Sequence, residues 1–112
     1  MSTPAAFRRL ALALAGAGEG AHMGHADFRA NGRIFATLGS PDEAHAMVQL
    51  PPEEQAMRVE AEPEVFRPAA GAWGRNGSTL VMLAAADEAT LAGALDCAHA
   101  AALSRPKGRS KG

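Results

Sequence analysis

Two histidines, His22 and His25, stand three residues apart in the stretch EGAHMGHADFR at residues 19–29. Histidine can ligate a transition metal or transfer protons near neutral pH, so this pair is the first place to look for chemistry. Residues three apart in an extended segment point to opposite sides, which disfavours a shared metal. We therefore expect no metal centre: one histidine hydrogen-bonds the loop backbone, and the other lies half-buried beside a sheet. Further ligands for a metal would have to come from Glu19, Asp27 and His45.

Nucleophilic catalysis finds little support in the residues. Cys97 and His99 are two apart in a helical segment, about 200° around the helix axis, so they cannot touch within one helix. The chain holds no Gly-x-Ser-x-Gly, no P-loop and no Gly-x-Gly-x-x-Gly pattern. We therefore predict a protein that is not an enzyme, with no catalytic residue, no metal and no cofactor.

Arginines offer a different chemistry, the neutralisation of phosphate. Arg29, Arg33 and Arg75 lie in or near a predicted hairpin and a glycine-rich loop, where they could gather as a basic patch. The overall charge opposes this, because residues 1–103 carry 7 basic residues against all 12 acids, a net charge of −5 that repels DNA at range. Residues 104–112 add four basic residues and no acid. DNA is thus one candidate partner.

A small-molecule pocket is the alternative. The segment EVFRPAAGAWGRNG at residues 64–77 has the glycine and proline content of a loop, and its Trp73 is the best candidate to line a cavity against the sheet. Aromatic residues make up only 4% of the chain, so we do not expect single-stranded nucleic acid to stack on the sheet. The residues that would line the pocket are His22, His25, Phe28, Phe35 and Trp73.

Three helices follow from capping residues and apolar spacing. Residues 4–15 form the first, capped by Ser2 or Thr3, with Gly16 and Gly18 ending it. Pro51 and Pro52 enter the second, and Pro63 ends it. Residues 86–103 hold the third, capped near Asp87, with one buried stripe formed by Leu91, Leu95, Ala98 and Ala102.

Four strands are predicted between and after these helices. Asn31-Gly32 joins residues 26–30 and 33–38 in a hairpin, since both turn positions need positive φ. A two-residue turn would place Phe28 opposite Phe35 and Arg29 opposite Ile34. The other two strands cover residues 45–50, with Ala46, Val48 and Leu50 inward, and residues 78–84.

The resulting order is α-β-β-β-α-β-α, a small α+β domain with an antiparallel sheet and helices packed on one face. We expect this single domain to span residues 1–103, with a disordered basic tail at residues 104–112. We expect a cytoplasmic protein with no membrane partner. The chain has one cysteine and no apolar run long enough to cross a bilayer, and its N-terminal segment has the pattern of an amphipathic helix. We expect a monomer.

Five segments in this order resemble the MmcQ/YjbR family of small bacterial proteins. They are EGAHMGHADFR at 19–29, NGRIFATL at 31–38, MVQLPPEEQ at 47–55, EPEVFRPAAGAWG at 62–74 and TLVML at 79–83. The resemblance runs from Phe7 to about Leu103. It implies a fold similar to that of the frataxin-like iron protein, and a DNA-binding role that the family takes from a likeness to a double-wing motif.

The chain departs from that family pattern at a position that matters for phosphate binding. Members commonly carry a lysine in the segment matching MVQL, where this chain has Gln49. Arg33 keeps the charge at the position of another frequent lysine. The resemblance therefore implies a phosphate-binding surface that has one cation fewer.

Overall fold

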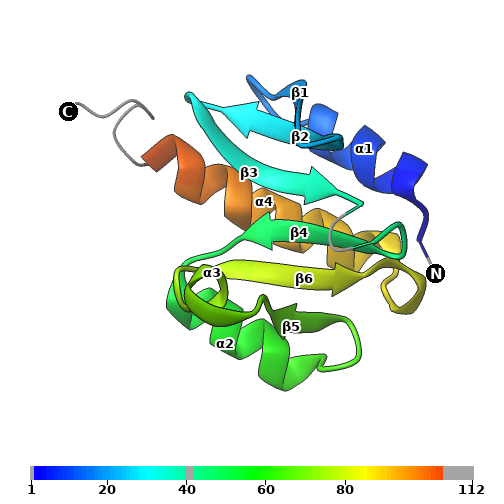
Figure 1. The fold of residues 1–112 in the computed structure, drawn as a ribbon, viewed down its shortest axis with the longest axis vertical. Helices are drawn as coiled ribbons and strands as arrows, with labels where there is room; N and C mark the ends of the chain where they lie inside the picture. The colour runs from blue at the N-terminus through cyan, green and yellow to red at the C-terminus, as the bar shows by residue number, and fades with distance from the viewer. Residues whose placement is uncertain (1, 40–41, 105–112) are drawn as a thin grey trace.

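The protein consists of a six-stranded antiparallel sheet with helices packed against it (Figure 1). The computed structural model describes residues 2–39 and 42–104, so the predicted tail lies outside the described residues apart from Ser104. The strand order is β1-β2-β3-β4-β6-β5. The predicted α+β class is confirmed, and every predicted helix and strand is found in the predicted order, with additional short elements between them.

The bounds of the elements are as follows. The strands are β1 (Gly18–His22), β2 (His25–Ala30), β3 (Arg33–Leu38), β4 (His45–Gln49), β5 (Phe66–Pro68) and β6 (Ser78–Met82). The helices are α1 (Pro4–Leu12), α2 (Pro52–Ala61), α3 (Gly71–Arg75) and α4 (Glu88–Ser104), with a 3-10 turn η1 at Leu83–Ala85.

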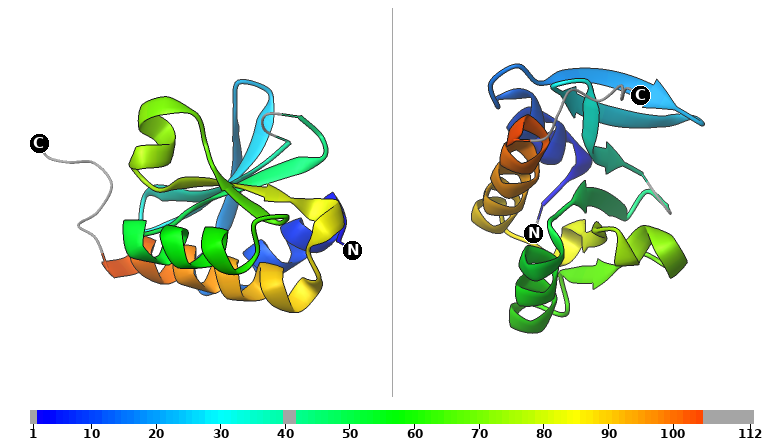
Figure 2. Two further views of the ribbon diagram at one scale, coloured as in Figure 1. Left: turned by 90° about the horizontal axis from the view of Figure 1, so that it is seen from below. Right: turned by 90° about the vertical axis from the view of Figure 1, so that its left-hand side faces the viewer.

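The three longer helices α1, α2 and α4 cover one face of the sheet, and the short α3 lies on the opposite side (Figure 2). The core fills the space between the sheet and these three helices. Its large side chains are fully buried. They are Phe7, Phe28, Phe35, Phe66, Leu91 and Leu95.

Capping residues set the helix starts as predicted. The Thr3 hydroxyl accepts the Ala6 N–H at 3.1 Å, and the Asp87 carboxylate accepts the Thr90 N–H at 2.8 Å. The predicted apolar stripe of α4 is buried throughout. The first helix ends at Leu12 rather than at residue 15, because the chain turns there to begin β1 at Gly18.

The predicted hairpin between β2 and β3 turns at Asn31 and Gly32, with φ of 56° and 73°. Arg29 pairs with Ile34, as predicted, but Phe28 pairs with Ala36 and not with Phe35. The prediction for Phe28 was wrong because the register shifts at this point, leaving Phe35 as the extra residue of a β-bulge. The bulge lets Phe35 and Ala36, neighbours in sequence, both lie buried.

Two segments predicted to be loops contain regular structure. Residues 18–22 form β1, which pairs with β2 through a second tight turn at Met23 and Gly24, both with positive φ. The Gly-Glu-Gly-Ala sequence of β1 has no apolar alternation that would indicate a strand. Residues 64–77 contain β5 and α3, of three and five residues, which are too short to show a periodic pattern.

Candidate functional site

The side of the sheet away from α1, α2 and α4 carries one row of residues across all six strands. The pairing runs from Gly20 to Asp27, then to Thr37 and Met47, and on to Leu80 and Arg67. We call this side the open face. Alternation along each strand places these residues opposite the core residues Phe28, Val48 and Val81.

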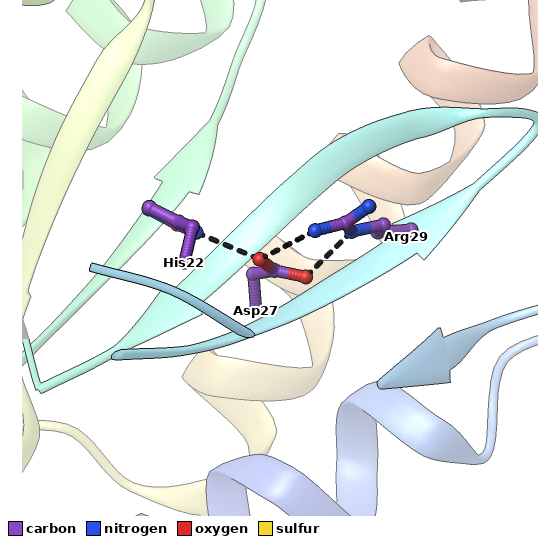
Figure 3. A network of polar contacts seen from close by, with 3 residues as sticks. All are labelled: His22, Asp27 and Arg29. Atoms are coloured by element: carbon purple, nitrogen blue, oxygen red, sulfur yellow. Dashed lines mark hydrogen bonds and ion pairs between the residues drawn. The ribbon is translucent and has the colours of Figure 1, made fainter. Parts of the chain in front are cut away.

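Asp27 is the centre of a polar network on the open face (Figure 3). Its carboxylate accepts the Nε–H of Arg29 at 2.7 Å, the Nη2–H of Arg29 at 3.0 Å, and Nδ1 of His22 at 2.7 Å. The Asp27 side chain is 0% exposed, whereas those of His22 and Arg29 are 40% and 48% exposed. The carboxylate is therefore covered by its own partners.

Electrostatics favour the ionised form of the Asp27 carboxyl. The hydrogen bonds from Arg29 lower the pKa of the Asp27 carboxyl, against the opposing effect of its burial, and His22 adds to the lowering. Asp27 in turn raises the pKa of Arg29. Because an ionised carboxylate can only accept, Nδ1 of His22 donates the hydrogen bond to Asp27.

The cross-strand partner of Asp27 must be small. A Cβ atom on Gly20 would lie 3.0 Å from Oδ1 of Asp27 and 3.2 Å from Nε of Arg29. Both contacts are tighter than most Cβ atoms make, so a side chain at this position would force Asp27 or Arg29 to shift by a few tenths of an ångström. Gly20 thus permits the geometry of the network.

The two histidines, His22 and His25, lie directly opposite one another, as the last pair of β1 and β2. Their ring centroids are 6.5 Å apart with an interplanar angle of 63°. His25 is half-buried, as expected of one histidine, but His22 bonds a carboxylate and not the loop backbone. The described residues hold no group of three or more potential ligands arranged for a metal ion.

Arg29, Arg33 and Arg75, the residues expected to contact DNA, reach the same end of the sheet. Arg29 and Arg33 line one open depression of about 310 Å³ with Gln49 and the last turns of α4. Gln49 donates from Nε2 to the carbonyl of Asn76, the residue after Arg75, at 2.8 Å. We call this region, formed by Arg29, Arg33, Gln49 and Arg75, the arginine end.

The five residues expected to line a small-molecule pocket are placed apart. Phe28 and Phe35 are 0% and 1% exposed within the core, where Phe28 packs on Phe7 and Phe35 packs on His99. Trp73 is 73% exposed on α3, and His25 lines a separate depression with Leu38. The β-bulge turns Phe35 toward α4, and α3 holds Trp73 away from the sheet, so the structure does not bring these side chains together.

Cys97 and His99 do not form a catalytic pair in the structure. The pKa of the Cys97 thiol is raised, chiefly by burial and then by the charge of Glu54 on α2. His99 donates from Nε2 to the backbone carbonyl of Ala15 at 2.6 Å, which joins α4 to the segment between α1 and β1. His99 is therefore committed to a structural bond and not to the thiol.

Sequence reasoning missed the buried role of Asp27, although part of the signal was present. Asp27 and Arg29 are two apart on a predicted strand, and that spacing puts both side chains on one face. The contribution of His22 needed the register of β1 with β2, and β1 itself was not predicted.

The chain is a small α+β domain. Three helices cover one face of its six-stranded antiparallel sheet, the opposite face is open, and arginines lie at one end. The YjbR family model matches residues 12–101, and the chain belongs to this family, which confirms the resemblance found in the sequence. No curated protein matches the chain.

A solved structure agrees with this assignment at the level of the fold. The crystal structure of the Deinococcus radiodurans protein DR2400, with a DUF419 domain, superposes with a TM-score of 0.74. The match covers 99% of this chain and 84% of that one, at 18% sequence identity. Among the described residues, no helix combines the length and apolarity needed to cross a membrane.

Proposed function

We propose that this chain is a non-catalytic DNA-binding protein that contacts phosphate groups through the arginine end. The observation that carries the proposal is the convergence of Arg29, Arg33 and Arg75 on one end of the sheet, from β2, β3 and α3. Phosphate contacts from arginines supply the sequence-independent part of DNA affinity. An α+β domain with a net acidic charge needs such a local concentration of cations to approach DNA at all.

The distribution of ion pairs supports this choice of surface. Arg8, Arg9 and Arg58 are paired with Glu19, Glu88 and Glu54. Within the described ranges, Arg67 and Arg75 make no ion pair. The sequence has no acidic residue from Val65 to Ala86, which contains both of them. Cations available to a phosphate are thus concentrated around β5 and α3.

Arg29 supports the proposal in a second way. Its Nε and Nη2 atoms are held by Asp27, which fixes the plane of the guanidinium. The Nη1 group is directed to neither oxygen, and the side chain is 48% exposed. A guanidinium whose orientation is already fixed loses less conformational entropy on binding an anion.

The end of α4 lies beside the turn that precedes Arg33. Asn31, in the turn before Arg33, donates from Nδ2 to the carbonyl of Ala102 at 3.0 Å. In the sequence, Ser104 is followed by four cations, Arg105, Lys107, Arg109 and Lys111. These charges offset part of the net −5 of residues 1–103.

The test is fluorescence anisotropy of a labelled duplex at several salt concentrations, with a matched pair of double variants. Arg33→Gln/Arg75→Gln removes two cations at the arginine end, and Arg8→Gln/Arg9→Gln removes two from α1, on the other face. We expect the first pair to weaken binding and to reduce the slope of log affinity against log salt by about 2. An equal loss in both pairs, or no binding of wild type at low salt, would refute the proposal.

A further inference from the structure

We propose that Trp73 is a stacking platform for an unpaired base, so that this chain prefers single-stranded nucleic acid. This inference rests on the proposed function, because the arginine end would hold the phosphates on either side of the stacked base. The carrying observation is the position of the only tryptophan, which is 73% exposed on α3 beside the arginine end. It differs from the expectation, drawn from the low aromatic content, that such stacking is absent.

The local geometry explains why the indole points outward. Gly74 is the buried residue of α3, and a Cβ atom there would collide with the backbone carbonyl of Ala69. Its neighbours are turned about 100° to either side of it on a helix, so Trp73 and Arg75 project from the packed side in two directions. Both side chains are exposed. The helix is thus anchored by its glycine and presents an aromatic ring and a cation.

The contacts of α3 keep this presentation fixed. Gln55 on α2 donates from Nε2 to the carbonyl of Gly74 at 3.0 Å and to Oγ1 of Thr79 at 3.0 Å. Gln49 reaches the carbonyl of Asn76 from β4. A five-residue helix tied to two other elements by side-chain bonds offers a rigid ring, and little order has to be gained when a base stacks on it.

The charges around Trp73 match a polyanion and not a basic or apolar partner. Arg75 lies two residues along, and Arg67 lies on β5, which contacts α3. Both are exposed and, in the part of the chain that the structure describes, neither has an acidic partner. An exposed indole with a cation nearby is an arrangement that sequence-tolerant binders of single strands use, since every base has a π-face. A duplex keeps its bases stacked and offers no such face.

The experiment uses the full chain, and Trp73 reports on itself because the chain contains no second tryptophan and no tyrosine. Oligo(dT) and a duplex of equal length are titrated at low salt while Trp73 emission and anisotropy of the labelled DNA are followed. We expect quenching by oligo(dT) only. Trp73→Ala should weaken oligo(dT) binding by about tenfold or more, with Trp73→Phe in between and the duplex little affected.

Met57→Ala is the matched control, because Met57 is another exposed apolar side chain, at 51%, on the opposite side of the sheet. It should bind both DNAs like wild type. If both DNAs bind in an arginine-dependent manner while Trp73 emission is constant and Trp73→Ala binds normally, the stacking inference is wrong and the proposed function stands. If wild type binds neither DNA, both fail.

Discussion

Replacing Asp27 with asparagine is the most informative test of the open-face network. The change keeps the shape of the side chain but converts one carboxylate oxygen into an NH2 group. Oδ2 accepts from both His22 and Arg29, and Oδ1 accepts from Arg29 alone. If the amide nitrogen takes the place of Oδ2, His22 can still form a hydrogen bond by moving its proton to the other ring nitrogen. The guanidinium of Arg29 has only donors, so its contact with the amide NH2 group is lost.

The magnitude follows from burial. Hydrogen bonds to a charged partner contribute about 1.5–3 kcal/mol each when intact, and the partners here are 40% and 48% exposed, so solvent recovers part of the loss. The Asp27 side chain is 0% exposed and cannot recruit water. We therefore expect Asp27→Asn to lower the free energy of unfolding by about 2 kcal/mol. This corresponds to a drop of about 1–2 M in the urea midpoint.

The pH dependence supplies an independent check with a defined sign. The folded-state pKa of Asp27 is depressed, so its contribution is complete above the unfolded value of about 3.9 and is lost as pH falls through the folded-state pKa. Asparagine does not titrate. The stability gap between wild type and Asp27→Asn should thus be largest near pH 7 and narrow steadily below pH 4.

The assay is urea unfolding followed by far-UV circular dichroism at pH 7 and pH 3, because Trp73 is already exposed and reports poorly on unfolding. Asp42→Asn is the control: this carboxylate also bonds a histidine, His45, at 2.8 Å, but it is 63% exposed. Its midpoint should move far less. A gap for Asp27→Asn below about 0.5 kcal/mol, or one that is unchanged on acidification, would refute the account of the buried carboxylate.

Two further outcomes are expected from the structure. Gly77→Ala should lower Tm by about 10 °C or more, because φ of Gly77 is +103° and a Cβ atom would collide with the carbonyl of Leu50. Gly16→Ala is the control and should lower Tm less, because Gly16 has φ +72° but open space around it. Similar Tm values for the two variants would contradict this reasoning. Cys97 should react with a thiol reagent at pH 8 more slowly in the folded chain than in urea, since its thiol pKa is raised by burial; equal rates would show an unperturbed thiol.

The parts of the fold that could be predicted carry strong local signals. The Asn31-Gly32 turn requires positive φ at both positions, and α4 has a capping aspartate followed by a long apolar stripe. Such features are decided within a few residues of sequence. The family resemblance was also found from residues alone, because five segments keep their order and spacing.

The parts that could not be predicted depend on contacts between distant residues. β1 and β5 are held by their neighbours in the sheet and have no pattern of their own, and the bulge at Phe35 is decided by the packing of α4 against β3. The burial of Asp27 has no signal in its own residue type, since aspartate is rarely buried without partners. Its burial depends on β1, which brings His22 and the bare Gly20 beside it.

An NMR titration tests the location of binding most directly. Backbone amide shifts of the full chain would be followed as a short oligonucleotide is added at low salt. We expect changes at the arginine end and α3, around Arg29, Arg33, Gln49 and residues 73–77, with α1 and α2 unmoved. Changes on the helix-covered face, changes limited to residues 105–112, or no changes at all would contradict the claim that this end of the sheet binds nucleic acid.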